Sequence, residues 1–114
     1  MDNKNIQEFI RAVDKAYKTG LCKVLRGQYF KYDNNANLCC CAITASILEE
    51  GKRLPEGQIF NTAKKKFGLS EQLLQGVMSG FDGVTPLPES SYFSKHEAGY
   101  KIGCDLRIKH PMVV

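Results

Sequence analysis

The sequence predicts a mainly α-helical fold, a compact bundle of about five helices with one small β-hairpin. Apolar residues recur at steps of three and four along most of the chain, as on the buried face of a helix. Glycine and proline separate these stretches. One stretch, residues 28–32, is instead rich in aromatic residues and leads into turn-forming Asp and Asn. The length of 114 residues fits a single domain, which we expect to span residues 1–114.

The first predicted helix covers residues 5–18. Its inner stripe is apolar and consists of Ile6, Phe9, Ile10, Val13, Ala16 and Tyr17. Asn5 can cap its start together with Glu8, and Gly20 ends it. Residues 21–26 are apolar on one side, and we expect one or two helical turns there.

The predicted hairpin begins at residues 28–32 and turns at residues 33–37, where Asp and Asn tolerate turn conformations. Its second strand is short and runs into Leu38. Residues 39–50 are almost all small or apolar, which predicts a helix buried on both faces. Glu49, Glu50 and Gly51 give that helix a polar exit and a stop.

Three further helices complete the prediction. One opens at Leu54 and Pro55 and ends at Gly68, and the next is capped by Ser70. Residues 82–89 form an exposed loop with two prolines. The last helix starts with a capping box of Ser94 and Glu97, stapled by Phe93, and ends before Pro111.

Gly99 and Gly103 lie four residues apart on one face of this last helix. Each glycine costs the helix about 1 kcal/mol relative to alanine. The sequence therefore predicts that something approaches the backbone closely there, either a helix of the same domain, a second copy in a homodimer, or a ligand.

Composition excludes several classes of protein. With 43% apolar, 10% aromatic and 25% charged residues, the chain is neither disordered nor collagen-like. No apolar run approaches the ~20 residues that span a bilayer, and no signal peptide pattern opens the sequence. The five cysteines are odd in number and three are adjacent, which does not fit a disulfide framework. We expect a cytoplasmic protein in a reducing compartment that binds no membrane.

The three adjacent cysteines raise two chemical hypotheses. A metal site is not favoured, because successive helix residues point ~100° apart and no CxxC pair occurs, so we expect no metal and no cofactor. A cysteine-dependent hydrolase is an alternative, with Cys39 or Cys40 as nucleophile in the first turn of a helix, His96 as base, and Asp82 or Asn37 orienting it. The competing explanation is that the cysteines are small core residues, and no local catalytic signature surrounds them. We therefore favour a protein that is not an enzyme.

The net charge is +4, from 16 Lys and Arg against 12 Asp and Glu. This mild excess is below that of a dedicated nucleic-acid domain. Nucleic-acid binding is still an alternative, because cations and aromatics interleave in the hairpin: Lys23, Arg26, Tyr29, Phe30, Lys31 and Tyr32. Alternation along the strand leaves only one face to stack bases. A second basic run, Lys64, Lys65 and Lys66, reads equally well as a solvated helix face.

Parts of the chain resemble a group of small bacterial and phage proteins of no established activity. The stretch LRGQYFKYDNNANLCCCAITASIL, residues 25–48, is similar to their hairpin followed by a Cys-Cys-x-Gly or Cys-Cys-x-Ala helix start, with Ala42 where many have glycine. GLSEQLLQGVMSGFDG and AGYKIGCDLR resemble their GFDG turn and GxxxGxxLR ending. The resemblance covers about half of the chain. It implies a shared fold and a bacterial or mobile-element setting, and no mechanism.

We expect a small intracellular binding or regulatory protein that acts on a partner macromolecule. A protein is the expected partner, with nucleic acid as the alternative. The predicted binding surface comprises the hairpin and the region near the Asp82 loop: Arg26, Tyr29, Lys31, Asp82, Gly99, Gly103 and Arg107.

Overall fold

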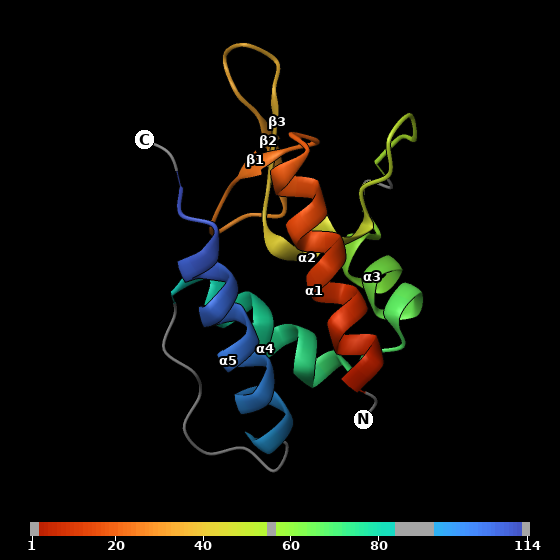
Figure 1. Cartoon of the computed structure of the whole chain (residues 1–114), viewed down its shortest axis with the longest axis vertical. Coiled ribbons are helices and arrows are strands. Elements are labelled where there is room, and N and C mark those ends of the chain that lie inside the picture. The colour runs from red at the N-terminus through yellow and green to blue at the C-terminus, as the bar shows by residue number, and fades with distance from the viewer. Residues whose placement is uncertain (1–2, 55–56, 84–92, 113–114) are drawn as a thin grey trace.

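A computed structural model describes residues 3–54, 57–83 and 93–112 of the chain (Figure 1). In order, its elements are α1 (Asn3–Lys18), β1 (Lys23–Val24), β2 (Phe30–Tyr32), β3 (Leu38–Cys40), α2 (Ala42–Ile47), α3 (Ile59–Phe67), α4 (Glu71–Asp82) and α5 (Phe93–Lys109). Within the described residues there are thus five helices and three short strands. The prediction of a mainly α-helical fold with a small β element is confirmed.

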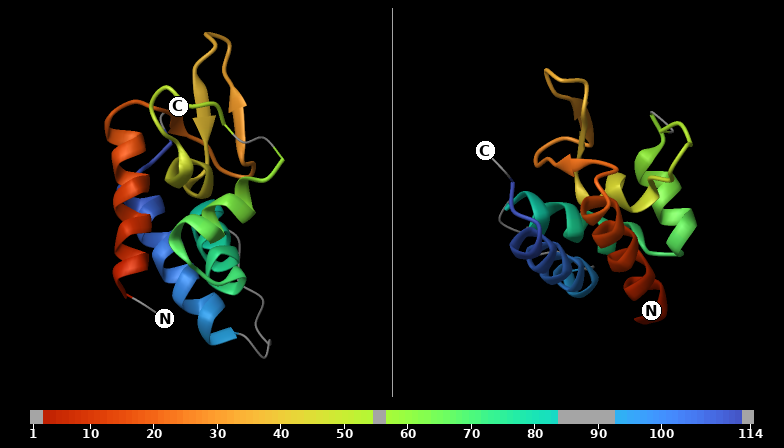
Figure 2. Two further views of the ribbon diagram at one scale, coloured as in Figure 1. Left: turned by 90° about the vertical axis from the view of Figure 1, so that its right-hand side faces the viewer. Right: turned by 45° about the horizontal axis from the view of Figure 1, so that its top comes forward.

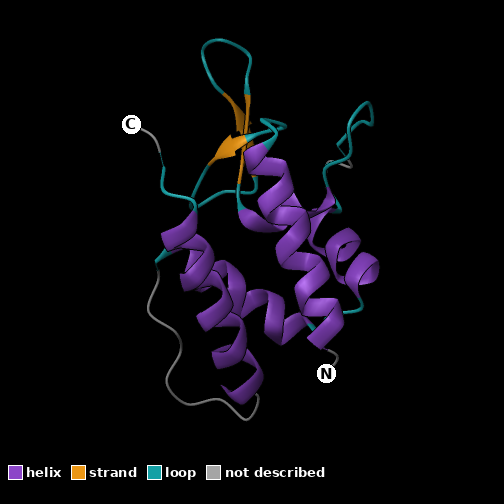
Figure 3. Ribbon diagram, viewed as in Figure 1, coloured by secondary structure: helices purple, strands orange, loops and turns teal. Residues whose placement is uncertain are grey.

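The three strands form one sheet in the order β1-β3-β2 (Figure 3). β2 and β3 pair antiparallel as the expected hairpin, with Lys31 opposite Cys39. The turn between them is closed by Asp33, whose Oδ1 accepts the backbone N–H groups of Asn35 and Asn37, each at 2.9 Å. This is the local bonding that makes Asp a turn residue.

Two sequence expectations are corrected by this sheet. Residues 21–26 do not form a helical turn, because Lys23 and Val24 pair in parallel with Cys39 and Cys40. The helix expected at residues 39–50 is also shorter, because β3 continues to Cys40 and α2 covers only Ala42–Ile47. A short apolar run is compatible with either a buried strand or a buried helix, and here the pairing of β3 with two neighbours decides the outcome.

The remaining boundaries mostly follow the predicted signals. Gly68 ends α3 in the left-handed conformation, and the Ser70 side chain caps α4 by accepting the Leu73 N–H at 3.2 Å. However, α3 begins at Ile59, not at Leu54, and Pro55 lies outside the described residues. Most of the predicted loop, residues 84–89, also lies outside them. Because α5 begins at Phe93, Ser94 is inside the helix and not at its cap.

The sheet lies at one end of the long axis of the molecule, and the first turn of α5 lies at the other (Figures 1 and 2). Helix α1 packs along α2, with Phe9, Val13 and Ala16 buried beneath it. The Phe9 and Phe67 rings meet edge to face, with centroids 5.5 Å apart, and join α1 to α3. Burial of these apolar residues is the main stabilising contribution to the fold.

Among the described elements, helices α4 and α5 share the most extensive contact. A Cβ atom at Gly99 would overlap the Leu73 carbonyl oxygen, and one at Gly103 would overlap that of Val77. From the other side, a Cβ at Gly80 would overlap the Tyr100 carbonyl oxygen. The close approach that the glycines predicted is therefore made by a helix of the same chain. Within the described residues, no helix combines the length and apolar character needed to cross a bilayer.

Candidate functional site

Arg26 joins the loop after β1 to the ends of two helices. Its Nε donates to the Phe81 carbonyl oxygen at 3.0 Å. Its Nη2 donates to the carbonyl oxygens of Arg107 at 3.0 Å and His110 at 2.9 Å. These carbonyls belong to the last turns of α4 and α5, or lie just beyond them, where backbone acceptors lack helical partners. The guanidinium also lies 5.2 Å from the centroid of the Phe81 ring. Its Nε and Nη2 donors are thus occupied within the fold.

Asp82 lies beside this junction at the C-terminal end of α4. Its Oδ1 accepts the backbone N–H of Gly27 at 3.0 Å. The chain turns at Gly27 with a φ of +86°, a conformation open to glycine. At Gly83 an added Cβ would overlap the Arg107 guanidinium, so Arg107 lies against the end of α4. The structure thus brings together three of the predicted site residues, Arg26, Asp82 and Arg107.

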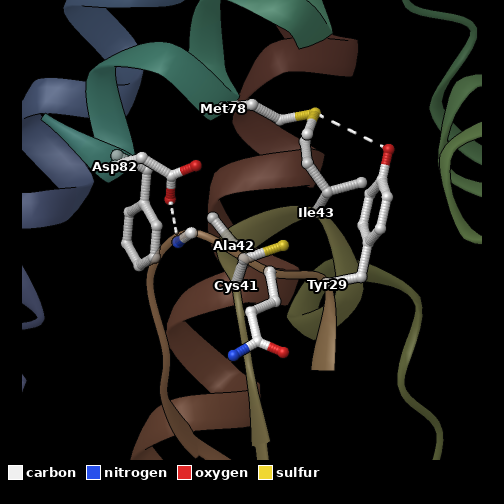
Figure 4. Close-up of a pocket in the computed structure, with 9 residues that line it drawn as sticks. Tyr29, Cys41, Ala42, Ile43, Met78 and Asp82 are labelled. Atoms are coloured by element: carbon white, nitrogen blue, oxygen red, sulfur yellow. Dashed lines mark hydrogen bonds between the residues drawn. The ribbon is translucent and has the colours of Figure 1, made fainter. Parts of the chain in front are cut away.

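A pocket of about 110 Å³ opens next to this junction (Figure 4). Two predicted site residues, Tyr29 and Asp82, line it from opposite sides. The Tyr29 hydroxyl points at Met78 Sδ at 3.9 Å, so Met78 forms part of the wall beside Tyr29. Cys41, Ala42 and Ile43, at the start of α2, lie between the two sides. The lining is mostly apolar, with one carboxylate at its edge.

The floor of this pocket is held by hydrogen bonds. The Thr44 hydroxyl donates to the Tyr29 carbonyl oxygen at 2.8 Å. Its single proton is then used, so Thr44 Oγ1 accepts from the Cys41 thiol at 3.6 Å. Burial raises the pKa of Cys41, although the backbone N–H groups of Thr44 and Ile43 act in the opposite direction. The thiol is therefore kept neutral at physiological pH.

The hairpin extends beyond the pocket and carries exposed side chains. Lys31 is exposed and the Tyr32 side chain is 57% exposed, whereas Phe30 packs partly against the core. Lys23 forms an ion pair with Asp33 at 3.2 Å. The N–H of Asn37 and the Lys23 ammonium lower the pKa of Asp33 to about 2. Of the six interleaved cations and aromatics, Arg26, Tyr29 and Lys23 are thus engaged within the fold.

A second, wider hollow of about 880 Å³ lies between the end of α1, the sheet and the C-terminal segment. Leu21, Lys23, Leu38 and Met112 are among its lining residues. This hollow is open to solvent, and both polar and apolar residues line it. Of the predicted binding residues Lys31 lines it, and of the candidate catalytic residues Cys39 and Asn37 do.

The predicted glycines lie apart from the pocket. Gly99 and Gly103 are buried in the contact with α4, and their backbone is covered by the Leu73 and Val77 carbonyls. The contact between the two helices accounts for both glycines. No ligand is needed to explain them.

The structure does not bring the proposed nucleophile and base together. Cys39 and Cys40 lie in β3, so neither is in the first turn of a helix. The backbone of His96 lies in the first turn of α5, at the opposite end of the molecule (Figure 1). A hydrogen bond with Cys22 and burial raise the pKa of Cys40, whose side chain is fully buried. These thiols therefore have the environment of core residues.

All five cysteines are free thiols. Among the residues that the structure describes, no three His, Cys, Asp or Glu side chains are grouped so that they would hold a metal ion.

The other histidine, His110, is part of a polar cluster that sequence reasoning missed. His110 is 8% exposed, and its Nε2 lies 2.6 Å from Asp14 Oδ1. Lys109 Nζ donates to Asp14 Oδ2 at 2.8 Å, which ties α1 to the end of α5. Burial on its own raises the pKa of Asp14, but the hydrogen bonds and charges of Lys109 and His110 outweigh it and lower the pKa below its usual value. Asp14 lies on the edge of the apolar stripe of α1, and no spacing in the sequence links it to residue 110.

The pocket also contains residues that the sequence did not single out. Met78 is one of the apolar residues of α4, and in the sequence Cys41 stands out only as one of three adjacent cysteines. Their role as lining depends on the loop 26–29 folding over the end of α4, a long-range contact without a local signal.

No protein-family model, curated protein or solved structure matches this chain.

Proposed function

We propose that this protein acts by binding a partner protein, and that the pocket between Tyr29 and Asp82 receives an apolar side chain of that partner. The observation that carries the proposal is the pocket itself, which opens at the surface and is lined by apolar groups. Interfaces draw most of their affinity from a few anchor side chains buried in such pockets. Its volume of about 110 Å³ is somewhat smaller than the cavity of about 150 Å³ that holds benzene in another protein. An aliphatic side chain is of suitable size.

The surroundings favour a protein partner over a small ligand. Tyr29, a large side chain that is 37% exposed, lines the pocket. Tyrosine is enriched in protein interfaces because it offers a large contact area at a low cost in conformational entropy. The Asp82 carboxylate at the edge would also favour a cation next to the anchor residue. The pocket alone is too small to enclose a typical metabolite.

We propose the cellular compartment and the biological source of the protein from its sequence. Five free cysteines fit a reducing, cytoplasmic compartment. The resemblance of residues 25–48 to small bacterial and phage proteins favours such a source. A regulatory role is part of the same proposal.

Selection of peptides on the immobilised protein tests the proposal. We expect enriched peptides to share an aliphatic residue flanked by Lys or Arg. Tyr29→Ala removes one wall of the pocket and should weaken binding of the selected peptide at least tenfold. Tyr32→Ala is the matched control, because it makes the same change on the same hairpin outside the pocket lining, and it should alter affinity less than threefold. Equal losses in the two variants would place the binding surface on the hairpin, not in the pocket.

A further inference from the structure

Helix α1 presents a line of cations on the face opposite the core. Arg11, Lys15 and Lys18 are all exposed. Their spacing of four and three residues places them on one stripe, because successive residues of a helix turn by ~100°. The buried residues Phe9, Val13 and Ala16 point to the other side. The stripe extends for about 10 Å along the axis, at ~1.5 Å per residue.

Internal ion pairs do not account for this stripe. None of the three cations forms a salt bridge with another described residue. Like charges at this spacing repel and cost a helix a few tenths of a kcal/mol. The helix dipole favours cations in the last turn, which covers Lys15 and Lys18, but its effect has faded at Arg11.

Acidic groups near the stripe are few. Glu8 is exposed on the same side of α1. Asp14 lies beside the stripe, but its two oxygens contact Lys109 and His110 at the end of α5. The negative charge of Asp14 is therefore compensated. The positive charge of Lys109 is offset by Asp14, so this pair adds no net charge at this side. The surface along α1 is therefore more positive than the net charge of the whole chain suggests.

We propose that the exposed face of α1 is an electrostatic docking surface for the phosphate backbone of double-stranded DNA. A duplex carries one negative charge per ~1.7 Å of its axis, so a straight row of cations can lie along several phosphates at once. Exposed aromatic side chains that would stack on bases are absent from α1, which predicts binding independent of base sequence. The apolar face of α1 is used by the core, so the helix has none left to insert into a membrane. This surface is separate from the pocket, and the proposal does not depend on it.

Fluorescence anisotropy with a labelled duplex of arbitrary sequence, over a series of salt concentrations, tests this proposal. The variant Arg11→Gln, Lys15→Gln, Lys18→Gln removes the stripe, and Gln keeps a similar helix propensity. The control variant Lys52→Gln, Arg53→Gln, Lys65→Gln removes three exposed cations outside α1 and the hairpin and leaves the same formal charge. Circular dichroism establishes that both variants are folded.

We expect the native protein to bind the duplex at low salt and to lose affinity as salt rises. The α1 variant should lose at least tenfold in affinity, and the slope of log K against log salt should fall by about 0.9 for each cation removed. The control variant should keep the affinity and the salt dependence of the native protein. The proposal is overturned if the two variants lose equally, if the native protein does not bind the duplex at low salt, or if it binds only vesicles rich in phosphatidylserine or an acidic polypeptide such as polyglutamate.

Discussion

Arg26 shows how one side chain can hold three parts of this chain together. Lysine and arginine differ here, because the planar guanidinium has five donors in a fixed arrangement and the ammonium is a single point. Arg26 uses that arrangement to reach carbonyl oxygens of both α4 and α5 ends. The sequence predicts Arg26 as a binding residue because cations and aromatics interleave around the hairpin. Its contacts in the folded chain also make it a residue that supports the pocket.

We predict that Arg26→Lys destabilises the protein by about 2 kcal/mol, because at least one of the partly buried carbonyls of Phe81 and His110 would be left without its donor. Urea unfolding followed by circular dichroism measures this. Arg11→Lys is the control, since Arg11 is exposed and forms no ion pair with a described residue, and we expect a change below about 0.5 kcal/mol. Equal stability of the two variants would mean that Arg26 does not hold the helix ends.

At the scale of elements, the pair α4 and α5 is the most constrained part of the fold. Glycines on both helices let the backbones approach, and each carbonyl occupies the space that a Cβ would need. The helices cannot move apart at one glycine without disturbing the junction at Arg26, because both helices end there. Packing at this contact therefore fixes the position of Asp82 and of one side of the pocket.

We predict that Gly103→Ala destabilises the protein by about 3 kcal/mol or more, because backbone atoms of α4 cannot yield as a flexible side chain would. Thermal and urea unfolding measure the effect. Lys101→Ala, an exposed position of α5 between the two glycines, is the control and should be near neutral. A stable Gly103→Ala variant would contradict the close approach of α4 and α5.

Local signals in the sequence predict the helices well, because the residues that start and end a helix lie within or next to it. Asn5, Gly20, Gly68 and Ser70 marked helix limits that agree with the structure to within a few residues. The sequence missed β1, a strand of two residues that pairs with β3 across more than ten residues of chain, and it missed that β3 continues to Cys40. No periodicity can appear in so few residues, and the apolar cysteines then continued the pattern of the helix that follows.

At the scale of the whole molecule, the sheet lies at one end of the long axis and the first turn of α5 at the other (Figure 1). The Arg26 junction and the pocket lie where the loop after β1 meets the end of α4. Sequence reasoning found Tyr29 and Asp82, because an aromatic hairpin and a glycine-flanked aspartate are visible locally. It could not find that they face each other across Ala42, since 53 residues of sequence separate them. The sequence also predicts Gly99 and Gly103 as part of the binding surface. Glycines four residues apart indicate that some group packs closely on the helix, but they do not indicate that this group is the backbone of α4.

The most direct test of the proposed pocket is nuclear magnetic resonance of the protein labelled with ¹³C at its methionine methyl groups. The sequence has three methionines, so the spectrum is simple. Met78 lines the pocket and Met112 lines the wider hollow near the sheet. On addition of a selected peptide we predict that the Met78 signal shifts and saturates while the Met112 signal stays in place. Saturable binding that moves Met112 and leaves Met78 unchanged would contradict the account and place the partner in the wider hollow.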